Sequence, residues 1–470
     1  MFFSGAMLLV LSTPDAAAAD VAGEAEVMAT AVALPILSPA PPSAPLGREV
    51  LPNGVTIIVR PNSFSNVVGM ELVSRFGTRF EEPAESGLAN LTLRCVLDGT
   101  STRSRDALHS WFEDRGSSLQ GQSHPDYSEI GTSVMAPDFV EMARIMADLA
   151  QDAALTPAIF TAEHNEVLRQ IGSSTRDEQG AAYSSLRTLL ADSTAYGRSE
   201  AGLVATVSTL SSDDVHAFYL KLFAPQELVV VVSGAVPLAD TLKLLRGLFA
   251  GIPARTVSPP PQGIHTVVHE PSSMVTAGYG DEAWIMLGYL TPGVRDPDYA
   301  AAAVLNAIIG GENSGLLPSL FRNQNGVYES GSFVQPFAYQ THIVAYVRAD
   351  PILWDQERQK MRPVVDEFYR QMKGIFDGIR EHGVTDSQVR AGREFLKGQY
   401  MRARERNREC AGYLGWYEAI GLGAGFDERF LKEVDAVSAR EVNRLAATCL
   451  GSMQAAAVVM LPRPRAEDAQ

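Results

Sequence analysis

Cysteine and long apolar runs are scarce in this chain of 470 residues. Its three cysteines, Cys95, Cys410 and Cys449, cannot all pair with one another, and each falls in an apolar helical pattern. We therefore expect buried thiols, and neither a disulfide framework nor a redox compartment follows from them. Beyond the N-terminal region, no stretch approaches the roughly 18 continuous apolar residues of a membrane helix. The sequence thus predicts no integral membrane segment.

Motifs for nucleotide binding and for serine hydrolysis are missing as well. Residues 310–315 read GGENSG, but Leu316 and Leu317 follow where a phosphate-binding loop needs Lys and Ser or Thr. The chain contains no Gly-x-Ser-x-Gly turn that would expose a serine nucleophile. These absences exclude a nucleotide cradle and a nucleophile elbow of these types.

Histidine is also scarce, with eight residues in the whole chain. His265 and His269 form a close pair, but residues 266–268 between them are β-branched and follow the prolines at 259–261. This composition favours an extended conformation. Four residues along a strand separate the two imidazoles by roughly 13 Å. We therefore expect the pair to be two polar residues near the start of a strand, without a shared metal ion.

What the chain does contain is an excess of acidic side chains. Asp and Glu number 55 against 39 Lys and Arg, a net charge of −16, and 46% of the residues are hydrophobic. The acidic balance disfavours a nucleic-acid partner. The length and the apolar content predict a globular protein of roughly two to four domains with cores of their own.

The N-terminal region resembles an export signal in part. Residues 6–11 form a short apolar run, and residues 16–20 read AAAAD, which is typical of a cleavage site, although no basic residues precede the run. Residues 21–45 are rich in Ala and Pro and predict an extended linker. We expect a periplasmic or otherwise exported protein; a cytoplasmic chain with an Ala-rich leader is the open alternative.

Two segments of the chain repeat one another at a constant distance. Residues 211–215 open an amphipathic helix that leads to the apolar run 229–233, and residues 438–442 open another that leads to 456–460. Both pairs are offset by 227 residues (438 minus 211, and 456 minus 229). Each helix begins with Ser followed three residues later by an acid, which is a capping signature. The two segments therefore look like copies.

The beginnings of the two copies also correspond. Residues 67–73 predict a strand followed by a helix over 87–97, and residues 283–289 predict a strand followed by a helix over 299–309. Strand, helix, further helices, hairpin strands and a final helix–strand unit thus occur twice. We predict an α+β fold of two homologous halves, each with a mostly antiparallel sheet flanked by helices.

Domain boundaries follow from this repeat and from the proline-rich stretch between its copies. The predicted order is a leader and linker, an N-terminal domain, a hinge, a C-terminal domain and a short tail: 1–46, 47–251, 252–271, 272–463 and 464–470.

Residues 86–100 read SGLANLTLRCVLDGT and follow the lead-in LPNGV at 51–55 and the run 67–81. This segment closely resembles the start of the pitrilysin/insulinase family of zinc metallopeptidases, whose helix carries His-x-x-Glu-His. The resemblance extends from about residue 47 to residue 462 and implies that the two halves form half of a peptidase clamshell.

All four functional positions of that family are altered in this chain. The motif falls on Asn90, Leu93 and Arg94, and the third ligand, in a downstream helix of pattern Glu-x6-Glu, falls on Gln170. Catalytic Zn²⁺ takes protein ligands from His, carboxylate or thiolate, whereas Arg94 places a fixed cation at the metal position. Leu93 has no proton to exchange. We predict no catalytic residue and no metal here, with zinc expected only in a partner subunit.

The second half contains a motif that the resemblance connects with substrate. In paired members of the family the zinc-free chain contributes an Arg and a Tyr, which here correspond to Arg322 and Tyr328 around Gly326. Both side chains can donate hydrogen bonds to a peptide carbonyl. One residue fewer separates Gly326 from Tyr328 than in the family, which turns Tyr328 to the opposite face of a strand unless a β-bulge absorbs the shift. The alternatives are a surface cation at a helix C-terminus for Arg322 and a core aromatic for Tyr328.

Taken with the resemblance, these residues predict a catalytically inactive subunit of a heterodimeric zinc metallopeptidase. It would bind and enclose an extended peptide, by strand addition to a sheet edge, for a homologous zinc-bearing partner. One alternative is a scaffold protein that retains the peptidase fold without processing peptides. A second alternative, an active peptidase with an unusual site, is disfavoured because no cluster of His or Cys is present.

Overall fold

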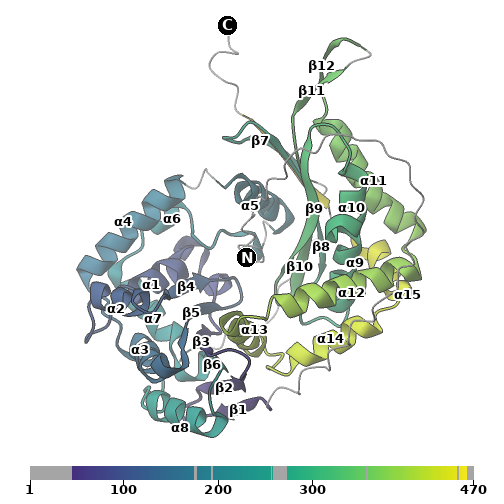
Figure 1. The fold of residues 1–470 in the computed structure, drawn as a ribbon. Coiled ribbons are helices and arrows are strands. Elements are labelled where there is room, and N and C mark those ends of the chain that lie inside the picture. The colour runs from purple at the N-terminus through teal and green to yellow at the C-terminus, as the bar shows by residue number, and fades with distance from the viewer. Residues whose placement is uncertain are drawn as a thin grey trace, which may run out of the picture. The chain divides into compact units, whose positions relative to one another are not determined.

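The computed structural model of this chain places most of it in two sheets with flanking helices (Figure 1). Several stretches lie outside the described residues: 1–44 of the predicted leader and linker, 258–271 of the predicted hinge with His265 and His269, and 463–470, which include the predicted tail. The residues that the structure describes belong to one compact unit by their contacts. The structure describes residues 45–173, 177–191, 194–255, 257, 272–355, 358–451 and 455–462.

The first half builds a six-stranded sheet. All of its neighbouring strands are antiparallel except one pair, β2 with β6, which is parallel. Valine and isoleucine fill its central strands, which suits strands buried on both faces. In spatial order the strands are β1 (Gly47–Val50), β2 (Thr56–Pro61), β6 (Leu228–Gly234), β3 (Val67–Ser74), β5 (Ser128–Met135) and β4 (Gln120–Ser123).

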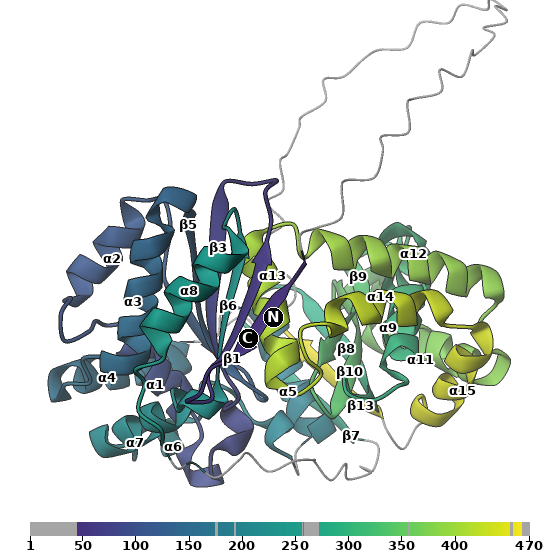
Figure 2. The same ribbon diagram turned by 90° about the horizontal axis from the view of Figure 1, so that it is seen from below.

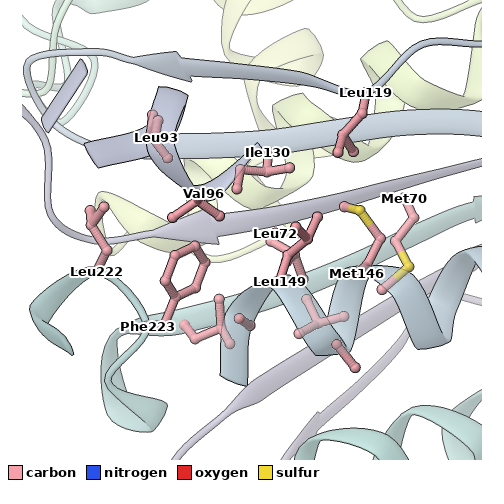
Figure 3. Close-up of a cluster of buried hydrophobic side chains, with 14 of the residues drawn as sticks. Met70, Leu72, Leu93, Val96, Leu119, Ile130, Met146, Leu149, Leu222 and Phe223 are labelled. Carbon is pink, nitrogen blue, oxygen red and sulfur yellow. The ribbon is translucent and has the colours of Figure 1, made fainter. Parts of the chain in front are cut away.

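Helices α1, α3, α7 and α8 contribute side chains to the main core of this half, together with the sheet. Figure 3 shows Met70 and Leu72 of β3 and Ile130 of β5 packing toward Met146 and Leu149 of α3. The helices of the first half are α1 (Leu88–Val96), α2 (Arg105–Glu113), α3 (Phe139–Asp152), α4 (Pro157–Ser173), α5 (Glu178–Ala191), α6 (Val204–Val207), α7 (Ser212–Leu222) and α8 (Leu238–Phe249).

The second half builds a five-stranded sheet and a separate hairpin. Its sheet strands are, in spatial order, β7 (Ser272–Ala277), β13 (Ala455–Leu461), β8 (Ala283–Pro292), β10 (Gln340–Ala349) and β9 (Val327–Pro336), and the hairpin pairs β11 (Ile352–Asp355) with β12 (Lys360–Pro363). Its helices are α9 (Tyr299–Gly310), α10 (Leu316–Phe321), α11 (Val365–His382), α12 (Asp386–Arg402), α13 (Asn407–Ala419), α14 (Phe426–Ala436) and α15 (Ala439–Cys449).

The duplication is visible in the order of the strands. The sequence β2-β6-β3-β5-β4 of the first sheet corresponds to β7-β13-β8-β10-β9 of the second, with one parallel pair at the same place in each. Helices α7 and α15, 227 residues apart (439 minus 212), both begin with a capping box, from Ser211 and Asp214 and from Ser438 and Glu441. The predicted fold class of two homologous α+β halves is confirmed.

Each half lends one helix to the sheet of the other. Ala182 and Leu186 of α5 pack on Met286 and other residues of the second sheet, and Ala411 and Leu414 of α13 pack on strands of the first sheet. Figure 2 shows α13 beside β3 and β6. Each of these two helices buries apolar surface on the sheet of the other half. This burial holds the two halves together.

Glycines permit this close approach. A Cβ atom at Gly415 of α13 would lie 2.5 Å from Cγ2 of Val73, and one at Gly288 of β8 would lie 2.7 Å from Cδ1 of Leu190. Both distances are far shorter than a carbon–carbon contact, which is optimal near 3.5–4.0 Å. A larger residue at either position would therefore push the exchanged helix away from the sheet.

Buried carboxylates add polar ties between the halves. Arg404 and Arg60 oppose the effect of burial and hold the pKa of Asp427 below its ordinary value, while burial raises the pKa of Asp126. Such groups are stable in a core when partners satisfy them. Contacts of these carboxylates across the halves include Arg48–Glu418 at 2.8 Å, Arg60–Asp427 at 2.8 Å, Arg408–Glu71 at 3.0 Å and the Ala338 N–H to Asp126 at 2.8 Å.

Candidate functional site

Helix α1, which carries the altered motif, starts at a buried carboxylate. The side chain of Glu81 accepts hydrogen bonds from the backbone N–H groups of Gly87 (3.1 Å) and Ala89 (2.7 Å). These are the donors that a helix start leaves without partners. Gly87 has φ = 101°, and a Cβ there would lie 2.8 Å from the carbonyl oxygen of Ala201. Burial raises the pKa of Glu81 to about 7, although its two backbone donors oppose the shift.

Arg94 of α1 reaches across to helix α4. Its Nε donates to Oε2 of Glu163 at 2.6 Å, and its Nη1 donates to Oε1 of Gln170 at 3.1 Å. Gln170 in turn donates from Nε2 to Glu166 at 2.7 Å. The fold thus brings together two positions, Arg94 and Gln170, that are 76 residues apart in sequence and that correspond to two metal ligands in the resembled family.

Leu93, at the position of the catalytic glutamate, belongs to the core. Its side chain is 2% exposed and lies in the first-half cluster shown in Figure 3. A Cβ at Gly121 of the edge strand β4 would lie 3.6 Å from the Cβ of Leu93, so the helix packs closely under that strand. At this position the family has a glutamate that exchanges a proton with water, whereas Leu93 packs in the hydrophobic core.

Glu163 is the acceptor at the centre of this site. It is 5% exposed and is bonded by Arg94 and approached by Arg105 at 3.6 Å. Arg105 also pairs with Asp98 at 3.3 Å, and burial raises the pKa of Asp98. Two guanidinium groups therefore neutralise the two carboxylates that surround the former ligand positions.

These side chains do not fit a zinc ion. Arg94 occupies its neighbourhood with a permanent cation, and the amides of Asn90 and Gln170 are not among the usual zinc ligands. Within the described part of the chain, no group of three or more His, Cys, Asp or Glu side chains is arranged to hold a metal ion.

Arg322 and Tyr328 lie on the segment that joins α10 to β9. Arg322 is the exposed residue at the C-terminal end of α10. The strand pairing places Glu329 opposite Arg348 but Val327 opposite Ala349, so Tyr328 is the extra residue of a β-bulge. Tyr328 is 54% exposed, which rules out a core aromatic. Its hydroxyl donates to Asp350 at 2.9 Å, and its ring lies 5.7 Å from the Arg348 guanidinium.

Two residues of this site, Glu163 and Glu81, could not be assigned a role from the sequence. Glu163 was recognisable only as the first acid of the Glu-x6-Glu pattern, without a role. Glu81 lies six residues before Gly87 and eight before Ala89, whereas a capping box spans three residues, so no capping pattern points to it.

Family models match the chain over two adjoining stretches. One, described as insulinase (peptidase family M16), covers residues 56–201, and another, described as peptidase M16 inactive domain, covers residues 209–396. The chain belongs to the insulinase, or pitrilysin, family of peptidases, as the altered motif had predicted. Within that family, residues 209–396 match the inactive domain.

Related proteins agree with this assignment. An uncharacterized zinc protease of Mycobacterium leprae is 24% identical over 427 residues, which cover 89% of this chain and 92% of that protein. The mitochondrial-processing peptidase subunit beta of Blastocladiella emersonii is 23% identical over 203 residues, or 43% of this chain and 44% of that protein.

Solved structures share the fold at low sequence identity. A protease from Helicobacter pylori superposes with a TM-score of 0.78 at 14% identity, over 89% of this chain and 100% of that one. A peptidase M16 inactive domain from Pseudomonas fluorescens gives 0.78 at 15% identity, over 90% and 98%. At this level of identity the likeness extends to the fold, and the substituted site must be interpreted from its own residues.

Proposed function

We propose that this chain is the zinc-free, non-hydrolytic subunit of a heterodimeric peptidase. The observation that carries the proposal is the Arg94 guanidinium, which bridges α1 to Glu163 and Gln170 of α4 where the family coordinates its metal. The helices that frame a zinc site are retained, while each of the four functional positions is replaced. A chain that keeps these helices but lacks the metal ligands and the catalytic base fits a subunit that binds and positions a substrate for a partner.

Peptide binding is supported by the edge of the first sheet. β4 is bonded to β5 on one side, and among the described residues no strand lies on its other side. Gln120 and Gly121 of β4 are exposed. An extended peptide could add there as a further strand, with affinity from backbone hydrogen bonds and little demand on sequence.

A homologous zinc-bearing partner is supported by relatives that are named as subunits. They include the mitochondrial-processing peptidase subunit beta and cytochrome b-c1 complex subunit 1 of Bos taurus. For the partner of this chain, we expect an intact His-x-x-Glu-His helix and a bound zinc ion. Exposure of Arg322 and Tyr328 fits their proposed role as hydrogen-bond donors to the shared peptide.

The second candidate function is a scaffold that keeps only the fold. It is favoured by the way Tyr328 is held by Asp350 and Arg348 within its own chain. It is also favoured by the relative that is a cytochrome b-c1 complex subunit. The two functions differ in one requirement, since a peptidase subunit needs a zinc-bearing homologue and a scaffold does not.

The experiment is reconstitution with a zinc-bearing homologue from the same host, followed by assay with a library of unstructured peptides. We expect hydrolysis by the pair and none by this chain alone. Arg322→Ala should lower kcat/KM of the pair by roughly 100-fold, the effect of removing one donor to a developing oxyanion. The pair should remain intact in size-exclusion chromatography. Arg144→Ala, on the surface of α3, is the matched control.

Unchanged kinetics in Arg322→Ala would remove Arg322 from the site. Hydrolysis by the zinc-bearing homologue at the same rate with and without this chain would contradict the subunit proposal and favour the scaffold. Export is a further part of the proposal. Recovery of the processed chain in a periplasmic fraction would support it, and recovery in the cytosol with an intact N-terminus would contradict it. In the described residues, no helix is long and apolar enough to span a membrane.

A further inference from the structure

The turn between α10 and β9 contains one of the two Asn-Gly pairs in the chain. Asn325 and Gly326 lie in this turn, Asn53 and Gly54 precede β2, and both pairs are followed by valine. In such a pair the backbone nitrogen of the glycine can attack the side-chain carbonyl of the asparagine, because glycine has no Cβ atom to obstruct the approach. Since the local sequences match, any difference in reactivity between the two pairs comes from the fold.

Asn325 is exposed, and its turn is held at other atoms. The N–H of Gln324 donates to the carbonyl of Phe321 at 3.0 Å, and the N–H of Asp350 donates to the carbonyl of Gly326 at 2.8 Å. Within the part of the chain that the structure describes, no hydrogen bond holds the side chain of Asn325 or the N–H of Gly326. The two reacting groups can therefore meet without first breaking a hydrogen bond of their own.

Asn53 is held on both sides of the corresponding bond. Its Nδ2 donates to the carbonyl of Phe249 at the end of α8, at 2.9 Å, and its Oδ1 accepts from the N–H of Val55 at 3.3 Å. The N–H of Gly54 donates to the carbonyl of Leu51 at 2.9 Å. Attack at Asn53 requires these hydrogen bonds to open together, and each of them stabilises the folded arrangement.

We propose that Asn325 is a site of spontaneous deamidation and that the fold protects Asn53 from the same reaction. The Gly326 nitrogen forms a bond to Cγ of Asn325 and gives up its proton, the Cγ–Nδ2 bond breaks, and the amide leaves as ammonia. The product is a succinimide ring, which water then opens. Attack of water at Cγ releases the Gly326 nitrogen from Cγ and gives aspartate. Attack at the backbone carbonyl gives isoaspartate, in which the main chain continues through the side-chain carboxyl carbon.

Both products add a negative charge to the segment that carries Arg322 and Tyr328, because either carboxyl is ionised at neutral pH. The modified residue lies three positions from each of them (325 minus 322, and 328 minus 325). Isoaspartate also lengthens the main chain just before the β-bulge at Tyr328. The modification is a property of this chain alone and requires no zinc-bearing partner.

The first test ages the purified full-length chain in mildly alkaline buffer and follows both pairs by peptide mapping with mass spectrometry. We expect Asn325 to be converted at least roughly tenfold faster than Asn53, because several hydrogen bonds protect the latter. Fragmentation that cleaves the N–Cα bond distinguishes aspartate from isoaspartate. The control is the same chain unfolded in guanidinium chloride, in which the two pairs should react at similar rates.

The second test uses two substitutions in the same turn and measures charge variants by anion-exchange chromatography. Asn325→Gln should suppress the acidic species that accumulates in the unmodified chain, because the longer side chain must close a larger and less favourable ring. Asn323→Gln is the matched control and should accumulate that species as before. An Asn325 that stays intact in the folded chain, equal rates at Asn325 and Asn53 in the folded chain, or an acidic species that forms equally fast in Asn325→Gln would overturn the proposal.

Discussion

The two halves of this chain share the order of five strands and differ at the helix that follows the first central strand. In the first half, α1 keeps a polar side on which Arg94 bonds to α4. In the second half, the corresponding helix α9 has nine buried apolar residues. It packs so closely on α12 that a Cβ at Gly392 would lie 2.9 Å from Cγ1 of Ile308. The same fold therefore accommodates either polar contacts or close apolar packing at this helix.

The difference teaches that this scaffold can hold the same pair of helices together in two ways. In the first half the ionic bridge between α1 and α4 replaces the tie that a shared metal would supply, and Leu93 joins the core. In the second half the helix pair is closed by apolar packing alone. Both arrangements, an ionic bridge and apolar packing, occur in one chain. The fold itself therefore requires neither a metal ion nor a charged pair between these helices.

The largest expected effect comes from rebuilding the ligands in the first half. Combining Asn90→His, Leu93→Glu, Arg94→His and Gln170→Glu restores three ligands and a base on helices that already face each other. We expect about one tightly bound Zn²⁺ per chain, where the unmodified chain binds none, as measured by elemental analysis after dialysis. The control keeps Gln170 and carries the other three substitutions. Absence of zinc in the fourfold variant would mean that the helices do not hold the family geometry.

The next largest effect is a pH dependence of stability that arises at the start of α1 and not at the start of α9. Glu81 bonds the first N–H groups of α1, whereas α9 begins at Asp298 without a side-chain cap. With its pKa raised to about 7 in the folded state and near 4.3 unfolded, Glu81 stabilises the fold in its protonated form. That contribution is complete below the unfolded value and is lost as the pH rises through about 7, by at most about 4 kcal/mol.

Denaturant unfolding between pH 5 and pH 8 measures this effect. The free energy of unfolding should fall with rising pH, and Glu81→Gln should flatten the slope. Glu85→Gln, in the same segment, should leave the slope as it is. An equal slope in Glu81→Gln would show that Glu81 is ionised throughout this range.

A smaller effect probes the helix exchange. Gly415→Ala puts a methyl group against Val73, where its distance would be 2.5 Å, and overpacking of this kind destabilises by about 1–3 kcal/mol. A Cβ at Gly374 of α11 would meet no neighbouring atom within 4 Å, so Gly374→Ala should instead stabilise by about 0.5–1 kcal/mol through helix propensity. Thermal unfolding of both variants measures the contrast, and a stabilised Gly415→Ala would contradict the close approach of α13.

The smallest effect concerns the ionic bridge that distinguishes α1 from α9. Arg94→Ala leaves Glu163 with Arg105 alone, and we expect a loss of about 1–2 kcal/mol in the free energy of unfolding. Arg144→Ala removes an exposed pair with Glu141 and should change stability by less than about 0.5 kcal/mol. Urea denaturation measures both variants. Equal losses of stability would show that the Arg94–Glu163 pair contributes no more than an ordinary surface ion pair.

Local pattern accounts for much of what could be predicted. The capping serines Ser211 and Ser438 begin their helices as expected, and the constant offset of 227 residues (438 minus 211) predicted the duplicated helix–strand unit. These features depend on neighbours in the sequence, which a single chain displays directly. The substituted positions Asn90, Leu93 and Arg94 could be predicted equally well, because they lie at fixed spacing on one helix.

Other features depend on contacts between distant residues. The exchange of α5 and α13 could not be inferred from their apolar faces, since those faces fit a sheet of either half. The bulge at Tyr328 was one of two outcomes for a shortened spacing, and the pairing of β9 with β10 selected it. The matching strand order of the two sheets became visible only when they could be compared.

The sequence by itself determined that this chain carries the insulinase scaffold and that a permanent cation and an aliphatic chain stand in place of ligand and base. Residue identity and helical spacing decide those points, because the chemistry of a guanidinium does not depend on its surroundings. Only the tertiary structure decided that Arg94 bonds to Glu163 and Gln170, and that α5 and α13 each cover the sheet of the other half. Those outcomes depend on burial and on partners far apart in the chain, which arise only when the helices and strands pack together.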